Sequence, residues 1–196
     1  VMLLFWPTRF IIGTIAIHML ISDYAVIHRF WKQWEWNLAK LVIPGFYAGI
    51  VAGTSILVNL PDFWIRKSIG ASCLVFILTR TWSEIKGALP ALRIGRRAGF
   101  AIGLGGGIVS AIAHTGGTVL TLYLLSQGVQ KVQLVSTILV TWILVNPLKV
   151  ASYYAGGLLT PALLFAGAAS IPFAFAGGWL GRRVLDMMSQ RVFNFS

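Results

Sequence analysis

The sequence predicts an all-α fold, a polytopic bundle of transmembrane helices in two related halves. Hydrophobic residues make up 57% and charged residues 11% of the 196 residues, whereas about a quarter of the residues of a soluble domain are charged. The mean hydropathy is +0.81, and long apolar stretches alternate with short polar connections, which is the pattern of membrane-spanning helices. A soluble domain of this size could not bury so much apolar surface.

The chain is strongly basic, with 16 Lys and Arg residues against 5 Asp and Glu residues. The basic residues lie mostly between the apolar stretches, where membrane proteins carry interfacial anchors and topology signals. No basic stripe with interleaved aromatic residues indicates a nucleic-acid surface. The single cysteine, Cys73, lies in an apolar run and is expected to be a small buried hydrophobic residue. The composition therefore indicates the lipid bilayer as a partner and no nucleic acid.

Residues 1–86 are predicted to form the first transmembrane half, incomplete at its N-terminus. An apolar tail ends at Pro7, and no basic segment or cleavage site predicts a signal peptide. Three spans are expected at residues 10–27, 38–58 and 65–78. The segment 28–36 mixes aromatic and basic residues, as interfacial belts do.

A basic linker at residues 87–97, within a longer polar connection that starts at Arg80, is predicted to separate the halves. Residues 98–196 form the predicted second half, with a truncated last helix. Its first apolar stretch, 98–126, is too long for one simple crossing at 1.5 Å per residue, and it is predicted to be a broken helix, interrupted at residues 114–117. Two further spans are expected at residues 132–154 and 158–180.

A faint internal repeat favours two related halves, because Gly49 and Gly53 have the same spacing as Gly177 and Gly181. Such repeats are common among secondary transporters. If every apolar stretch crosses once, eight Lys and Arg residues lie on one side of the membrane and seven on the other. This difference is too small to set the orientation, and only the basic cluster in the connection 80–97 favours a cytoplasmic location for that connection.

A glycine-rich segment opens the second half, with Gly103, Gly105, Gly106 and Gly107. No predicted strand precedes it, so it is not a dinucleotide-binding fingerprint. Close helix packing by small residues is the favoured interpretation of these four glycines.

A polar segment follows within the same apolar stretch and contains Ser110, His114, Thr115, Gly116 and Gly117. Unwinding there would free backbone N–H groups, and the restarted helix would direct the positive end of its dipole into the membrane. A small anion can bind at such a helix N-terminus, so these five residues are candidate substrate ligands. Alternatively, His114 is only hydrogen-bonded within the bundle, but an ionisable residue at membrane depth favours a functional role.

The next span contains Asn146, Pro147 and Lys149. Proline loosens a helix and frees a carbonyl group. Asn146 and Lys149 lie three residues apart on one helix face, where an amide and a cation suit an oxyanion, so both are candidate substrate ligands. Lys149 could instead extend to the membrane interface, because the span ends about a turn later.

Asp23 is the one acid placed at membrane depth by this interpretation, near the end of the first span. Its partner is expected to be Lys149 or Arg9, and a position at the membrane interface is the slightly favoured alternative. His18 lies about one helical turn earlier, and His18 and Asp23 together are candidates for a proton or charge relay. A histidine in this position is more often a hydrogen-bonded residue of the bundle.

No nucleophile–base pair, paired carboxylates or metal-ligand cluster is evident, so the sequence predicts neither an enzyme nor a metal or cofactor. An intramembrane enzyme built on His18, His114 and Asp23 is the least favoured alternative. The tryptophans lie mostly near span ends and are interpreted as interfacial anchors.

Three parts of the chain resemble the sulfite exporter TauE/SafE family of bacterial membrane permeases. They are the segment 107–117, the segment 146–149 with Tyr153 and Gly156-Gly157, and Trp34-Glu35-Trp36 followed by Pro44, Gly45, Gly49, Gly53 and Leu60-Pro61. The resemblance implies two related halves of about four helices each, although only the tail 1–6 stands for the glycine-rich helix that would open the first half. It also implies secondary transport of small sulfur-containing anions, such as sulfite or organosulfonates, out of the cell.

The predicted function is therefore a secondary transporter of small anions, a multi-pass protein of the bacterial cytoplasmic membrane. The alternative is a non-transporting membrane scaffold or accessory subunit, whose glycines serve helix packing. A homodimer is left open.

Overall fold

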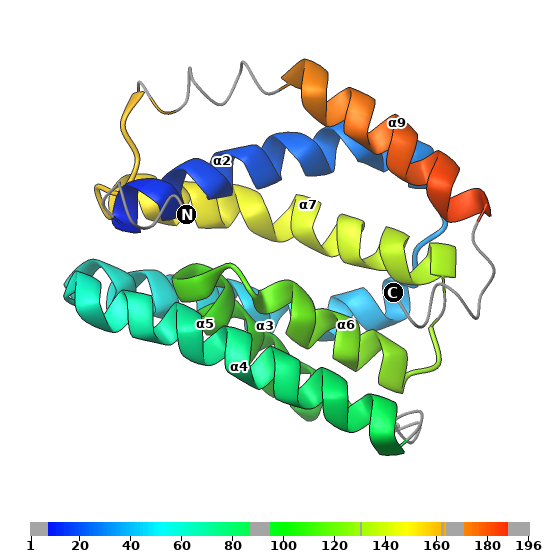
Figure 1. Cartoon of the computed structure of the whole chain (residues 1–196), viewed down its shortest axis with the longest axis horizontal. Coiled ribbons are helices and arrows are strands. Elements are labelled where there is room, and N and C mark those ends of the chain that lie inside the picture. The colour runs from blue at the N-terminus through cyan, green and yellow to red at the C-terminus, as the bar shows by residue number, and fades with distance from the viewer. Residues whose placement is uncertain (1–7, 87–94, 130, 162, 164–170, 188–196) are drawn as a thin grey trace.

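The computed structural model describes residues 8–86, 95–129, 131–161, 163 and 171–187, and these residues form a bundle of helices without a strand (Figure 1). The elements are α2 (Thr8–Val26), the 3-10 helix η1 (Ile27–Phe30), α3 (Trp36–Asn59), α4 (Asp62–Lys86), α5 (Arg96–Ala113), α6 (Gly116–Ser126), α7 (Lys131–Ala155) and α9 (Ile171–Met187). Three helical stretches are long and apolar enough to cross a membrane: Phe10–Phe30, Trp36–Asn59 and Lys131–Ala155. The predicted all-α class is confirmed.

The predicted span boundaries agree closely for α2, α3 and α7 and differ at two places. The helix α4 continues to Lys86, so residues 80–86 of the predicted polar connection are helical, and α5 already begins at Arg96. Residues 87–94 of the predicted linker, together with residues 1–7 and 188–196, lie outside the described residues.

The predicted span 158–180 starts about three residues early, because residues 158–160 are not helical and Pro161 is the first helical residue after α7. Gly157, at φ +70°, ends α7 in the left-handed conformation, and the Leu158 N–H donates to the carbonyl of Tyr153. The chain then presents buried leucines, residues 164–170 lie outside the described residues, and α9 begins at Ile171. This leucine cluster consists of Leu158, Leu159 and Leu163, which pack with Ile12, Ile17, Leu57 and Ile65.

The helices α3 and α5 run parallel and touch along their glycines. A Cβ atom at Gly45 or Gly49 would overlap the α5 backbone, and one at Gly103 would overlap the carbonyl of Val42. A Cβ at Gly107 would lie 2.6 Å from the carbonyl oxygen of Phe46. We call this contact the α3–α5 seam.

The predicted packing role is therefore confirmed for Gly103, Gly106 and Gly107, whereas a Cβ at Gly105 would meet open space. The proposed repeat gains no support from packing, because a Cβ at Gly177 or Gly181 would also meet open space, unlike one at Gly49 or Gly53.

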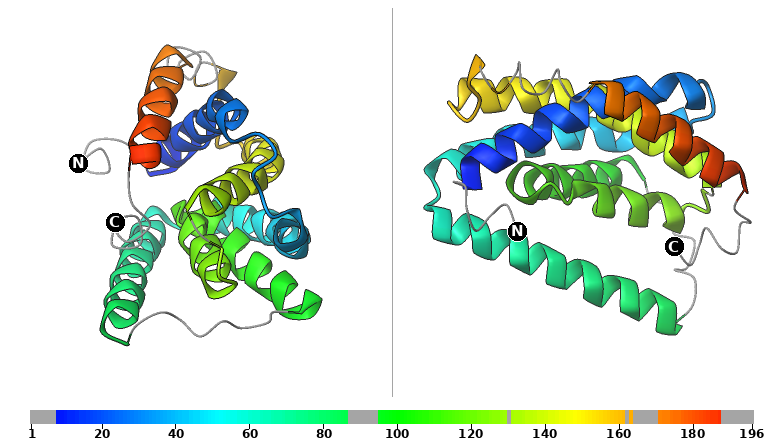
Figure 2. Two further views of the ribbon diagram at one scale, coloured as in Figure 1. Left: turned by 90° about the vertical axis from the view of Figure 1, so that its right-hand side faces the viewer. Right: turned by 45° about the horizontal axis from the view of Figure 1, so that its top comes forward.

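The helix break at His114 and Thr115 lies within the predicted interruption, but α6 does not continue in the direction of α5. A Cβ at Gly116 would lie 2.6 Å from the Gly106 carbonyl oxygen, and one at Gly106 would lie 3.3 Å from Val119. These contacts require α6 to turn back along α5 as a helical hairpin (Figure 2). The expectation that residues 98–126 cross the bundle once is thus wrong.

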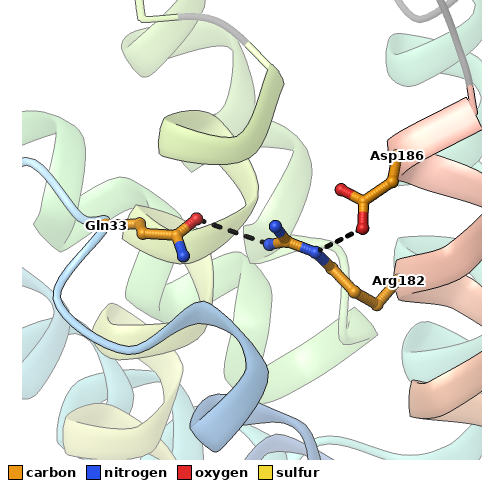
Figure 3. A network of polar contacts seen from close by, with 3 residues as sticks. All are labelled: Gln33, Arg182 and Asp186. Atoms are coloured by element: carbon orange, nitrogen blue, oxygen red, sulfur yellow. Dashed lines mark hydrogen bonds and ion pairs between the residues drawn. The ribbon is translucent and has the colours of Figure 1, made fainter.

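The helix α7 packs on both α3 and α2, and α9 packs on α2. At one end of the bundle, the Ser136 hydroxyl near the start of α7 donates to the Gln33 carbonyl at 2.7 Å. The Arg182 guanidinium of α9 reaches the Gln33 side chain at 3.4 Å and pairs with Asp186 at 3.1 Å (Figure 3). The connection between α2 and α3 therefore shares one end of the bundle with the start of α7 and the basic part of α9.

This arrangement overturns the expected division of basic residues, which assigned Lys131, Arg182 and Arg183 to the side opposite the α2–α3 connection. The hairpin returns the chain to the end of the bundle where α5 begins. The basic residues near helix ends are therefore divided unequally between the two ends of the bundle. One end, the basic end, has Arg29, Lys32, Lys40, Lys86, Arg96, Arg97, Lys131, Arg182 and Arg183, and the other has Arg9, Arg66 and Lys67.

Candidate functional site

His114 forms the turn between α5 and α6 in a conformation that is unusual for its residue type. Its φ of +55° lies in the left-handed region, which costs a residue other than glycine roughly 1–2 kcal/mol. Its Nε2 atom lies 3.0 Å from the Ile12 carbonyl oxygen, and its Nδ1 atom lies 2.8 Å from Lys149 Nζ. The carbonyl requires a hydrogen on Nε2, which leaves Nδ1 to accept from the ammonium group. These two bonds hold the strained turn in place.

Lys149 is 1% exposed and therefore does not extend to the membrane interface. Its ammonium group donates to Ser110 Oγ at 3.1 Å and to His114 Nδ1 at 2.8 Å. Both partners are neutral, and within the described residues no carboxylate forms an ion pair with it. An ammonium group has three hydrogens, so these two bonds leave one available. A buried cation without a direct counter-ion is costly unless an anion accompanies it.

Asp23 lies across from Lys149 on α2 and is half-buried. Its Oδ2 atom accepts a hydrogen bond of 2.6 Å from the Asn146 side-chain amide. Of the two expected partners, Lys149 forms no direct hydrogen bond with this carboxylate, and the side chain of Arg9 lies outside the described residues. The donor among the described residues is Asn146, which is 3% exposed.

Pro147 lies inside α7 without interrupting it. Because proline has no N–H, the Ile143 carbonyl loses its helical partner, as the sequence predicts. The Tyr24 hydroxyl of α2 donates to this carbonyl at 3.4 Å, and the Tyr47 hydroxyl of α3 donates to the Leu144 carbonyl at 3.1 Å. Two neighbouring helices therefore contact α7 at its proline, directly beside Asn146.

These polar groups surround one cavity of about 110 Å³. A single water needs roughly 10–15 Å³ of such space, whereas sites for drug-sized ligands have about 300–1,000 Å³. The cavity can therefore hold a small ion with a few heavy atoms. Its lining consists of Met19, Asp23, Ser110, His114, Gly117, Trp142, Asn146 and Lys149.

The N-terminus of α6 reaches the cavity through Gly117, whose added Cβ would meet only Trp142, at 3.9 Å. Gly116 instead permits the close start of α6 against Ser110 and Gly106. Thr115 precedes the helix, forms no side-chain cap, and its buried hydroxyl has no partner within the described residues. The first amides of α6 are therefore not satisfied by a capping side chain, and the positive end of its dipole faces the cavity.

The structure brings together most of the residues proposed from the sequence. Ser110, His114, Gly117, Asn146, Lys149 and Asp23 line the cavity, and Thr115 and Gly116 form the turn beside it. His18 is not in this lining, because its Nδ1 atom contacts the Thr14 carbonyl at 2.8 Å on its own helix. The three residues of the proposed enzyme alternative therefore do not meet at the cavity.

Two features of the site were missed at the sequence level. Trp142 was interpreted as an interfacial anchor, but it lines the cavity and its ring lies 5.2 Å from that of Phe46. Its position near the middle of the predicted span 132–154 was the available signal. Tyr153 is fully buried and donates to the Ala111 carbonyl in the last turn of α5, a contact for which the sequence gives no direct signal.

An all-helical bundle with three apolar helices of membrane-crossing length defines an integral membrane protein. The family comparison makes the class more specific: the chain matches the sulfite exporter TauE/SafE family over residues 1–195. The chain belongs to this family, and it is therefore a membrane transporter of the anion-exporter type. Comparisons with curated proteins and with solved structures found no match.

Proposed function

We propose that this protein is a secondary transporter that exports small sulfur oxyanions, such as sulfite or organosulfonates, across the bacterial cytoplasmic membrane. The observation that carries the proposal is Lys149, a buried cation with a free hydrogen in a cavity of about 110 Å³. Packing alone does not need this charge, because an apolar residue of similar volume would fill the same place at no cost in desolvation.

The ligand set suits an oxyanion with several acceptor oxygens. Lys149 supplies a positive charge, and the α6 N-terminus supplies amide hydrogens and the helix dipole. Ser110 and His114 hold the ammonium group in place, so it is positioned before the anion arrives. Preorganisation of this kind reduces the cost of binding.

The proposal is tested by flux measurements in proteoliposomes with Lys149→Met and His114→Ala. We expect both variants to accumulate in the membrane, and Lys149→Met to lose about 10–100-fold in sulfite or methanesulfonate flux, the equivalent of one charge-assisted hydrogen bond. His114→Ala should also lose flux, because the ammonium group of Lys149 loses one of the two partners that hold it. Lys67→Met is the matched control, because Lys67 lies over the rings of Phe63 and Trp64 away from the cavity. Unchanged flux in both site variants would remove the assignment of the site.

A membrane scaffold, in which the glycines serve packing alone, has the α3–α5 seam in its favour. The two functions differ in their response to ligand. A transporter is stabilised against heat by its own substrate through mass action, whereas a scaffold shows the same unfolding temperature with sulfite, sulfonates or carboxylates.

The basic end of the bundle supports a cytoplasmic location for the connections α2–α3, α4–α5 and α6–α7, since short cytoplasmic connections carry an excess of Lys and Arg. Cysteine labelling tests this orientation in a Cys73→Ser background. In intact cells, a membrane-impermeant thiol reagent should label Lys67→Cys and should spare Lys32→Cys until the membrane is permeabilised. The reverse pattern would invert the orientation.

A further inference from the structure

Asp23 poses an electrostatic problem for the proposed transporter, on which this inference rests. Its carboxylate and a bound anion would share one cavity of about 110 Å³ with the single cation Lys149. Without an anion, one negative and one positive group face the cavity. With an anion, an ionised Asp23 leaves an excess negative charge in a poorly solvated space, where like charges repel strongly.

The ionisable groups around Asp23 do not remove this excess. Across the cavity on α7 lies Lys149, which is already counted, and at the α5–α6 turn lies His114, whose Nδ1 accepts from that lysine. On α2 itself, His18 contacts the Thr14 carbonyl, and the neighbouring Tyr24 donates to Ile143.

The charged groups on the other helices that pack on α2 are also engaged elsewhere. On α9, Arg182 lies over the ring of Phe30 and pairs with Asp186. Arg183 of the same helix lies over the ring of Trp179. On α4, which meets α2 more weakly, Lys67 lies over the rings of Phe63 and Trp64.

We propose that Asp23 binds one proton for each anion that enters the cavity, so that proton and anion cross the membrane together. The geometry accommodates both protonation states. Oδ2 accepts from the Asn146 amide at 2.6 Å, and the carbonyl oxygen of a protonated carboxyl group still accepts such a bond. The proton then sits on Oδ1, which becomes a donor toward the anion.

Proton and anion therefore favour each other's binding, and this linkage is reciprocal. The cavity carries no net charge when it holds neither ligand, and none when it holds both. Movement between the two sides is then electroneutral for a monovalent anion. Its direction follows the product of the proton and anion concentrations on each side. Export therefore proceeds when the inside-to-outside ratio of anion concentrations exceeds the outside-to-inside ratio of proton concentrations.

The test uses wild-type protein in proteoliposomes loaded with methanesulfonate, a strong acid that carries no proton of its own at neutral pH, and a pH-sensitive dye in the lumen. Efflux from wild-type vesicles should make the lumen alkaline by about one proton per anion. Asp23→Asn should release methanesulfonate without this change in pH, and its net flux should depend on an imposed membrane potential. Asp186→Asn, which changes an exposed acid on α9, should retain the wild-type ratio.

Wild-type efflux without proton movement, or an unchanged ratio in Asp23→Asn, overturns the inference and leaves the proposed anion transport intact. Absence of methanesulfonate, sulfite and carboxylate flux in the wild type overturns both. If Asp23→Asn does not fold, methanesulfonate is added to purified wild-type protein in weakly buffered solution. Uptake of about one proton per bound anion supports the inference, and binding without proton uptake refutes it.

Discussion

The two sides of the cavity are built from different interactions. On one side, α3 and α5 touch backbone to backbone along Gly45, Gly49, Gly103 and Gly107. On the other side, α2 meets α7 through polar side chains, with the Asp23–Asn146 and Tyr24–Ile143 hydrogen bonds. Close packing tolerates little change in geometry, whereas hydrogen bonds of this kind can be exchanged for bonds to a ligand. The comparison indicates a rigid side that holds the hairpin and the N-terminus of α6, and an exchangeable side that holds Asp23 and Asn146.

The largest effect is expected at the α3–α5 seam. Gly103→Val should reduce the free energy of unfolding by about 3 kcal/mol or more, because its Cβ would overlap the backbone at Val42. Overpacking typically costs about 1–3 kcal/mol even where side chains can move. Gly105→Ala is the matched control, since its Cβ meets open space. Thermal unfolding in detergent compares the two, and equal stability of both variants would contradict a rigid seam.

The second-largest effect is expected in the cavity, at the two glycines with which α6 begins, Gly116 and Gly117. Gly117→Ala should leave the fold intact, since its Cβ meets only Trp142 at 3.9 Å, but it places a methyl group in the proposed anion site. We expect about a 10-fold loss in methanesulfonate affinity, which corresponds to about 1.4 kcal/mol.

Gly116→Ala provides the contrast to this variant, because its Cβ would lie 2.5 Å from the Ser110 Cβ. We expect it to lose thermal stability as well as binding. Affinities from isothermal titration, measured beside unfolding temperatures, separate the two glycines. A Gly117→Ala variant that binds as tightly as the wild type would move the anion away from the α6 N-terminus.

A smaller effect is expected where α2 and α3 contact α7 at its proline. Tyr24→Phe removes the hydrogen bond to the Ile143 carbonyl and should cost about 0.5–1.5 kcal/mol of stability. Pro147→Ala restores the missing N–H within α7. If the Tyr24 bond exists to satisfy that carbonyl, the double variant should lose less than the sum of the single changes, as a double-mutant cycle measures.

The smallest effect is expected on α9, at the exposed ion pair between Arg182 and Asp186. Asp186→Ala should change stability by less than about 1 kcal/mol, because exposed pairs of this kind contribute little. A larger loss in thermal unfolding would mean that the Arg182 contact with Gln33 positions α9 on the bundle.

The fold class and much of the site could be predicted from the sequence because both depend on local features. Apolar length predicts helices, and the polar residues beside Gly116 and Gly117 predict the break. The direction of α6 could not be predicted, since it depends on contacts between Gly106, Gly116 and Val119. The same limit applies to Asp23, whose partner Asn146 lies 123 residues away in the chain. Local patterns identified the polar groups, and only the packing of α2 on α7 shows which of them meet.

The leucine cluster has a consequence for the order of events in transport. Leu158, Leu159 and Leu163 pack tightly against the start of α2, near the Ile12 carbonyl that His114 contacts. In the proposed orientation these side chains lie on the extracytoplasmic side of the cavity, so the proposed export would bring the anion to the cavity first and past them last. On the proposed route, a change in their size should alter how fast the anion is released, while its equilibrium affinity for the cavity stays the same.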